Sequence, residues 1–212
     1  MRTLRDKVFV ITGASSGIGA ATAIEAARAG MNVVLAARRP TRLEQVAQAI
    51  RAAGREAAIV CCDVADPEAP RLVLDAAERS FGGFDAVFAN AGYGMEQTVL
   101  DTEDDELRAI FDVNFFASVA LVRDAARRLL TRKHPGHLLM CSSCMAKFTL
   151  PLHSAYSATK AAQAHVCRAM RHELAPHGIE VSSVHPVTTV TEFFERSSRG
   201  PGQKACAGIP EH

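Results

Sequence analysis

The sequence predicts an α/β fold in which a doubly wound parallel β-sheet is covered by helices on both faces. Two observations predict it. Six short apolar runs, many of them β-branched, alternate with longer segments of helical character, which is the pattern of repeated β–α units. Most of the apolar runs are also nearly continuous rather than alternating, as in parallel strands that are buried on both faces.

The strands are expected at the six apolar runs. In chain order these read KVFVIT, NVVLAA, AAIVCC, DAVFAN, HLLMCS and IEVSSVH. Their lengths suit strands rather than helices. The expected strands span residues 7–12, 32–37, 57–62, 85–90, 137–142 and 179–185.

The helices are expected in the segments between the strands. Gly30 and Gly178 stand just past the ends of two of them, where glycine commonly ends a helix. Asp66 followed by Pro67 offers a capping side chain and then a proline in the first helical turn. The expected helices span about 17–29, 40–53, 67–80, 103–132 and 154–175.

The length of the chain suits one domain with one sizeable core, because 212 residues are barely enough for two. We expect this domain to occupy residues 1–195. The remaining residues, 196–212, contain RGPGQKACAGIPEH, which is rich in glycine and proline and lacks periodicity. We therefore expect an irregular C-terminal tail. No internal repeat is visible.

Composition excludes several classes of partner. Apolar residues make up 48% of the chain and charged residues 22%, and the formal net charge is +1 without a basic block, so neither nucleic acid nor an anionic membrane is an expected partner. No apolar run is long enough to span a bilayer. The first strand begins at Lys7, which leaves no room for a signal peptide. A cytoplasmic protein is expected.

The six cysteines are expected to be free thiols in a reducing compartment. Cys141 and Cys144 form a C-x-x-C, which could be a redox pair or half of a zinc site. A zinc site needs a second pair at matching spacing, and the adjacent Cys61 and Cys62 do not provide it. Buried, inert thiols are the preferred interpretation, and no metal is expected.

A glycine-rich turn joins the first strand to the first helix. The stretch GASSGIG holds Gly13, Gly17 and Gly19, with Ser15 and Ser16 between them and Ile18 in the last interval. The first N–H groups of a helix lack internal partners and carry partial positive charge, and glycines let the backbone approach a bulky anion. The turn is therefore predicted to bind a pyrophosphate. The alternative is a tight turn whose small residues serve packing alone.

The end of the second strand indicates which dinucleotide is bound. In NAD-binding folds an acidic residue stands there, about 20 residues past the glycines, and binds the ribose hydroxyls. Here the chain has Ala37 followed by Arg38 and Arg39. Because guanidinium groups bind a 2′-phosphate that a carboxylate would repel, the cofactor is predicted to be NADP(H). The alternative is a pair of solvated surface arginines.

A candidate acid–base pair occurs in SAYSATKAA, where Tyr156 and Lys160 are four residues apart and so share one face of the predicted helix. An ammonium group beside a phenol favours the phenolate and should lower its pKa. Upstream, Ser142 and Ser143 end the fifth strand, at the edge where ligands bind in open α/β sheets. Together these residues suit proton exchange with an alcohol or carbonyl oxygen.

The combination resembles the short-chain dehydrogenase/reductase family, in particular its non-extended, single-domain branch. The resemblance is carried by TGASSGIG at 12–19, NAG at 90–92, Asn114, Ser143 and YSATK at 156–160, in this order between about residues 5 and 195. It implies a Rossmann-type catalytic domain that binds NADP(H). It also implies hydride transfer between nicotinamide and a substrate carbon, so that an alcohol and a ketone or aldehyde are interconverted.

The resemblance further implies a role for each matching residue. Tyr156 would be the general acid or base, Lys160 would lower its pKa and bind the nicotinamide ribose, Ser143 would hold the substrate oxygen, and Asn114 would anchor a water linked to Lys160. The remaining matches would contact or support the cofactor: Asp63 and Val64 at the adenine, and Asn90, Ala91 and Gly92 beside the central sheet. The family's dimers pack the helices corresponding to 103–132 and 154–175, so a homodimer or homotetramer is implied.

The sequence departs from the family pattern after the sixth strand. Pro186 is present, but Val187 replaces a glycine that precedes the nicotinamide contact, and Thr191 matches the threonine that would meet the carboxamide. A β-branched side chain could crowd the ring. The family's further helix and seventh strand are not recognisable, so the sheet is expected to have six strands with 179–185 as an exposed apolar edge. The chain would then be a truncated or frame-altered member.

The expected function is therefore an NADP(H)-dependent oxidoreductase acting on a CH–OH group, with an apolar small-molecule alcohol or carbonyl compound as substrate. The alternative is a catalytically impaired or non-catalytic nucleotide-binding or scaffold protein of the same fold, which Val187 and the short C-terminus would explain. Sugar-nucleotide epimerisation or dehydration would need a substrate domain that is not visible. A serine hydrolase would need a G-x-S-x-G elbow, which the chain lacks around Ser143.

Overall fold

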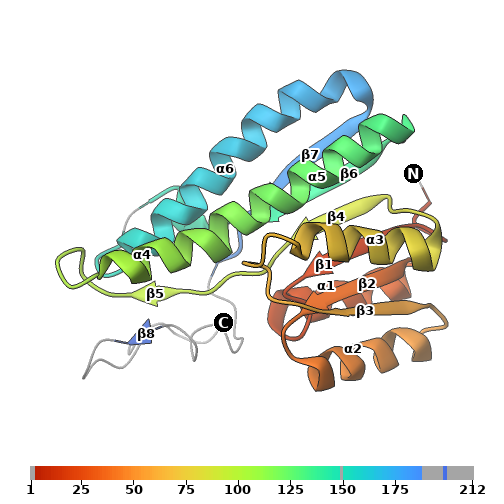
Figure 1. Ribbon diagram of the computed structural model, residues 1–212, viewed down its shortest axis with the longest axis horizontal. Coiled ribbons are helices and arrows are strands. Elements are labelled where there is room, and N and C mark those ends of the chain that lie inside the picture. Colours follow the sequence, from red (N-terminus) through yellow and green to blue (C-terminus); the bar gives the residue numbers. More distant parts are fainter. Residues whose placement is uncertain (1–2, 149, 188–197, 200–212) are drawn as a thin grey trace.

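A computed structural model describes residues 3–148, 150–187 and 198–199. Its main sheet has six parallel strands in the order β3-β2-β1-β4-β6-β7 (Figure 1). The strands are β1 (Val8–Thr12), β2 (Asn32–Ala37), β3 (Ala57–Cys61), β4 (Ala86–Ala89), β6 (Gly136–Cys141) and β7 (Ile179–Val184). The predicted doubly wound parallel sheet is confirmed, and every predicted strand overlaps an observed one.

Helices cover both faces of this sheet (Figure 1). On one face α1 (Gly17–Arg28) and α2 (Pro40–Ala52) enclose a buried cluster around Ile11, Leu35 and Leu43. On the other, α3 (Ala69–Phe81), α5 (Ala117–Arg132) and α6 (Ser154–Leu174) enclose a second cluster. Burying each large aliphatic side chain contributes about 1.5–3 kcal/mol, so the two clusters are the main source of stability.

The segment predicted as one helix over 103–132 is divided. It consists of α4 (Asp104–Phe111), a π-helical turn η1 (Asp112–Phe116) and α5. A π turn inserts an extra residue and frees backbone groups from the regular hydrogen-bond pattern. The periodicity of the sequence did not reveal this turn, and Asn114 lies at its centre, fully buried.

Short elements that were not predicted lie at the margins of the fold. β5 (Met95–Glu96) and β8 (Ser198–Arg199) form a separate two-stranded parallel ladder, so the structure has strands beyond the six predicted. The single turns η2 (Cys144–Ala146) and η3 (Ala175–His177) are 3₁₀-helical. Within the described residues β7 pairs with β6 alone in the main sheet. Apart from residues 198–199, the predicted tail at 196–212 lies outside the described residues.

The edge strand β7 is less apolar than the sequence predicted. Ile179 and Val181 are buried, whereas Val184 is exposed and two serines stand between them. The edge is therefore apolar only in part. Within the described residues, no helix combines the length and apolarity that crossing a membrane requires.

Candidate active site

The glycine turn lies tightly against the residues that follow β4. Gly13 has φ +66°, and a Cβ atom at this position would lie 2.8 Å from the Ala91 Cα. A Cβ at Gly19 would collide with the Gly13 carbonyl oxygen. Both positions thus exclude a side chain on steric grounds, so the packing role weighed for the turn is present.

The start of α1 remains open to an anion. Ser16 stands at the N-cap of α1, which begins at Gly17, but its side chain makes no capping hydrogen bond. Instead Arg39 donates to Ser16 Oγ at 2.8 Å and to Ser15 Oγ at 3.0 and 3.2 Å. Ile18 follows in the first turn and packs against the core cluster on that face of the sheet. A guanidinium group therefore lies beside uncapped helix N–H groups, which suits a phosphate-bearing ligand.

Arg38 turns to a different neighbour. Its Nη1 atom lies 3.5 Å from Asp63 Oδ2, and both side chains are more than two-fifths exposed. Exposed ion pairs of this kind contribute little, about 0–1 kcal/mol, so a more highly charged ligand could displace the carboxylate. Arg38 and Asp63 follow β2 and β3, and the glycine turn follows the neighbouring strand β1, so all three lie at one edge of the sheet.

Asn90 and Thr12 hold the NAG segment against the glycine turn. The Asn90 side-chain amide donates to the carbonyl oxygens of Thr12 at 3.0 Å and Gly13 at 3.4 Å. Thr12 Oγ1 accepts from the backbone N–H groups of Asn90 and Ala91 at 3.1 and 3.2 Å. Thr12 was not among the predicted site residues, although it opens the TGASSGIG motif.

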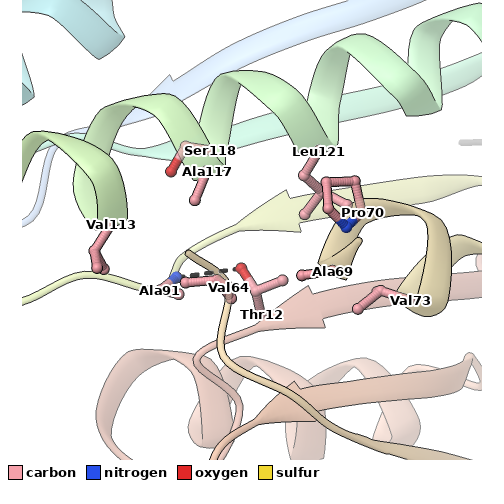
Figure 2. Close-up of a pocket in the computed structure, with 10 residues that line it drawn as sticks. All are labelled: Thr12, Val64, Ala69, Pro70, Val73, Ala91, Val113, Ala117, Ser118 and Leu121. Atoms are coloured by element: carbon pink, nitrogen blue, oxygen red, sulfur yellow. Dashed lines mark hydrogen bonds between the residues drawn. The ribbon is translucent and has the colours of Figure 1, made fainter. Parts of the chain in front are cut away.

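A small pocket lies beside this junction, and Figure 2 shows its side chains converging from β1, α3, η1 and α5. Val64 and Ala91, both predicted cofactor contacts, line it together with Val113. Its lining is mainly apolar, and its small size suits close packing between the sheet edge and α5. The full lining is Thr12, Val64, Ala69, Pro70, Val73, Ala91, Val113, Ala117, Ser118 and Leu121.

The predicted acid–base residues meet at the carboxyl edge of β6. Tyr156 lies in the first turn of α6 and is 8% exposed, and its hydroxyl group is hydrogen-bonded to the Ser143 side chain. Burial raises the pKa of Tyr156 to about 12, although the hydrogen bond with Ser143 acts in the opposite direction. The lowered pKa expected from the sequence is therefore not what this geometry produces, because the desolvation of the phenolate dominates.

Lys160 lies one turn along α6 and is 3% exposed. Its ammonium group donates to the Cys141 carbonyl oxygen at 2.8 Å and lies 5.6 Å from the centre of the Tyr156 ring. Burial lowers the pKa of Lys160 to about 8. A side chain at Gly92 would lie 3.3 Å from Lys160 Nζ, so the NAG segment borders the ammonium group directly.

Asn114 is held by hydrogen bonds on both sides. Its side-chain oxygen accepts from the Tyr93 N–H, and its amide donates to the Tyr93 carbonyl, both at 2.9 Å, and to Thr159 Oγ1 at 3.2 Å. Its backbone carbonyl accepts from Gln163 at 2.6 Å and from Ser118 at 2.9 Å. Since a carbonyl oxygen has two lone pairs, these two donors complete its capacity.

The segment after β7 approaches the same edge. The Pro186 carbonyl accepts from the Cys144 N–H at 3.0 Å, which places Pro186 beside the turn that follows Ser143. Val187 is 72% exposed. Thr191, the predicted carboxamide contact, lies outside the described residues.

A family model described as short chain dehydrogenase matches residues 7–201 of the sequence. The chain belongs to the short-chain dehydrogenase/reductase family. An uncharacterized oxidoreductase of Mycobacterium tuberculosis is 36% identical to this dehydrogenase/reductase over 195 residues, which cover 92% of the chain and 74% of that protein.

Solved structures of the family support the same fold. A short-chain type dehydrogenase/reductase from Mycobacterium marinum has a TM-score of 0.87 and 36% identity, covering 91% of this chain and 76% of that one. A family member from Burkholderia phymatum in complex with NAD has a TM-score of 0.88 at 28% identity, covering 96% and 75%. L-sorbose reductase from Gluconobacter frateurii, complexed with NADPH and L-sorbose, has a TM-score of 0.84 at 32% identity, covering 88% and 71%.

Several residues that shape the site were missed by sequence reasoning. Thr159 and Gln163 bind the Asn114 region from α6, and His185 contacts Ser143. The spacing of 156, 159, 160 and 163 along one helix face was available as a signal, but nothing in the sequence indicated what they face. Among the described residues, no three His, Cys, Asp or Glu side chains are arranged to hold a metal ion.

Proposed function

We propose that this short-chain dehydrogenase/reductase is an NADP(H)-dependent enzyme that interconverts an alcohol and a ketone or aldehyde. The observation that carries the proposal is the pairing of the Tyr156 and Ser143 hydroxyl groups at the carboxyl edge of β6, with the Lys160 ammonium group buried beneath them. Two hydroxyl groups that meet at one point can both bind a single substrate oxygen.

A pKa of about 12 suits Tyr156 to the reductive direction of the reaction, in which it acts as the acid. At neutral pH the phenol keeps its proton and can donate it to the oxygen of a carbonyl substrate, while Ser143 holds the same oxygen. When bound, the nicotinamide would supply or accept the hydride. In the oxidative direction the phenolate must form first, so oxidation requires a further lowering of the pKa of Tyr156 that a fully charged Lys160 would provide.

Lys160 is suited to that electrostatic role, because a pKa of about 8 leaves it largely protonated at neutral pH. Gly92 borders its ammonium group closely, since a Cβ there would lie 3.3 Å from Nζ, and Lys160 would bind the nicotinamide ribose as the family resemblance implies. Asn114 would anchor the water that the family resemblance implies. Its side-chain oxygen is the acceptor that remains for it, because its backbone carbonyl already has two donors.

The preference for NADP(H) over NAD(H) rests on Arg38 and Arg39. Arg39 already binds two serine hydroxyl groups at the glycine turn, and the ion-pair partner of Arg38 among the described residues is the exposed carboxylate of Asp63. Both guanidinium groups could bind a 2′-phosphate at low cost. Asp63, Val64 and Asn90 to Gly92 would border the adenosine and central parts of the cofactor, and Pro186, Val187 and Thr191 its nicotinamide end.

The test is a panel of ketones and aldehydes assayed with NADPH and with NADH. We expect turnover with NADPH, at least a tenfold preference for it, and loss of at least 100-fold of kcat in Tyr156→Phe. Arg38→Asp should reverse the cofactor preference while sparing the fold. Tight binding of NADPH without turnover of any substrate would support the non-catalytic alternative, and preference for NADH would contradict the assignment of Arg38.

Two further parts of the proposal concern assembly and location. We propose a homodimer or homotetramer formed through α4, η1, α5 and α6, supported by Phe116, which is 57% exposed at the junction of η1 and α5. Light scattering on the purified protein tests it.

We also propose a reducing, cytoplasmic location, supported by the five free cysteines among the described residues. The substrate is proposed to be an apolar small-molecule alcohol or carbonyl compound.

A further inference from the structure

We propose that His185 is a positioning residue that fixes Ser143 for substrate binding. This inference rests on the proposed function and assigns a part to a side chain that neither the motif pattern nor the proton-transfer residues include. His185 directly follows β7 and reaches across to the neighbouring strand end, where Ser143 follows β6.

The histidine ring is held at both nitrogen atoms. Its Nδ1 atom lies 2.9 Å from the Ser143 carbonyl oxygen, and its Nε2 atom lies 2.9 Å from Ser183 Oγ. A carbonyl oxygen can only accept, so Nδ1 must carry a hydrogen and donate it. Nε2 of the neutral ring is then an acceptor, and the Ser183 hydroxyl group donates to it. One neutral tautomer therefore satisfies both contacts.

The contact from His185 is to the backbone carbonyl of Ser143, and the position of this backbone sets where the Ser143 hydroxyl group points. Ser143 stands in extended conformation before η2, and its side chain accepts from the Met145 N–H at 3.1 Å. Its carbonyl oxygen also accepts from the Ala146 N–H at 3.1 Å. These two bonds lie within one short turn and can move together with it. The bond from His185 comes from another strand, so it ties the turn to the sheet.

A second hydrogen bond joins the same two strand ends, with its donor on the β6 side. The Cys144 N–H donates to the Pro186 carbonyl at 3.0 Å, next to His185 in the chain. Ser143 is thus flanked by cross-strand hydrogen bonds at its own carbonyl and at the following N–H. Because small displacements of a substrate-binding group can lower turnover by about 100-fold, a fixed carbonyl matters for the Ser143 hydroxyl.

The test compares variants of His185 that differ in whether they place an N–H donor at the Nδ1 position. His185→Ala removes the donor. His185→Gln keeps an amide that can meet Ser183 but places it beyond the Nδ1 position, whereas His185→Asn returns an N–H to the Nδ1 position. Ser183→Ala is the matched control, because it removes only the contact at Nε2. Tyr156→Phe reports separately on the proposed function.

We expect kcat/KM for a carbonyl substrate to fall by roughly 10- to 100-fold in His185→Ala and His185→Gln. His185→Asn should stay within about threefold and Ser183→Ala within about twofold of the parent protein, and the Kd for NADPH should be unchanged in all four. Hydrogen exchange of the peptide over residues 141–147 should rise in His185→Ala and His185→Gln only, a readout that needs no turnover.

Equal activity in the parent protein and His185→Ala would overturn the inference, and so would an Asn variant as impaired as the Gln variant. If His185→Ala does not fold, the comparison of Gln with Asn decides the same point. An inactive parent protein, or an active Tyr156→Phe, would instead count against the proposed function. In that case an unchanged hydrogen exchange at 141–147 would still refute the role of His185.

Discussion

The burial of Lys160 predicts that replacing it makes the protein more stable while abolishing its activity. Lys160 is 3% exposed, and its pKa falls from 10.5 to about 8 on folding. At pH 7 a shift of this size costs about 3 kcal/mol of folding free energy, at 1.36 kcal/mol per pKa unit. Lys160→Met removes that cost and loses one hydrogen bond to Cys141, worth about 1 kcal/mol. The variant should be more stable by about 2 kcal/mol.

The pH dependence has a definite sign. Because the folded pKa of Lys160 is depressed, the unfolded chain binds more protons between pH 8 and 10.5, so the stability of the parent protein rises with pH in this window. The advantage of Lys160→Met should therefore shrink by about 2 kcal/mol between pH 7 and pH 9.5. Other titrating groups are common to both proteins and cancel in the difference.

Urea unfolding of the two proteins without cofactor, at several pH values from 6 to 9.5, measures this difference. Lys147→Met is the matched control, because it makes the same residue change at an exposed position. A stability difference between parent and Lys160→Met that does not change with pH would refute the reasoning. It would mean that the ammonium group is hydrated in solution rather than desolvated.

Two further predictions concern packing and charge. Gly92→Ala should lower kcat at least tenfold with a stability loss of about 1–3 kcal/mol, because its Cβ would lie 2.9 Å from Asn114 Oδ1 and 3.3 Å from Lys160 Nζ; steady-state kinetics and urea unfolding measure both. Asp85→Asn should cost about 1 kcal/mol at pH 7. Burial of Asp85 opposes ionisation, but hydrogen bonds, including that from Lys7 at 2.9 Å, lower its pKa. The parent protein should therefore begin to lose this advantage as the pH falls below about 4, and urea unfolding should cease to separate it from the variant only once the pH has passed below the lowered pKa of Asp85.

The strands and most helices were predictable because burial on both faces leaves a local mark in the sequence. The run from Val8 to Thr12 is buried throughout, and no polar residue interrupts it before the threonine. The acid–base pair was predictable for a similar reason, since Tyr156 and Lys160 lie on one helix and their relative placement follows from helical geometry.

The partners of these residues were not predictable, because they come from elements far apart in the chain. Arg39 binds the serines of the glycine turn, 23 and 24 residues earlier. The sequence had predicted only that Arg39 would bind the 2′-phosphate of the cofactor. Lys160 donates to a strand carbonyl 19 residues away. The π turn around Asn114 has no marker in the pattern of apolar residues, since α4 and α5 on either side of it both bury apolar residues, Ile110 in one and Leu121 in the other.

The buried polar residues around η1 lower the stability of the fold but hold the residues of the site in place. Asn114, Thr159, Lys160 and Gln163 are all nearly inaccessible, and each occupies a place that an apolar side chain could fill. The Gln163 side-chain oxygen has no hydrogen-bond partner among the described residues, and a buried unsatisfied acceptor costs about 1–3 kcal/mol. An apolar side chain at position 163 would not carry this cost. A polar network instead fixes directions, because each hydrogen bond permits one arrangement of donor and acceptor. The position of α6 relative to η1 is thus specified by the hydrogen bond between Gln163 and Asn114 as well as by packing. Because Tyr156 lies on α6, this position also sets where Tyr156 stands at the edge of the sheet.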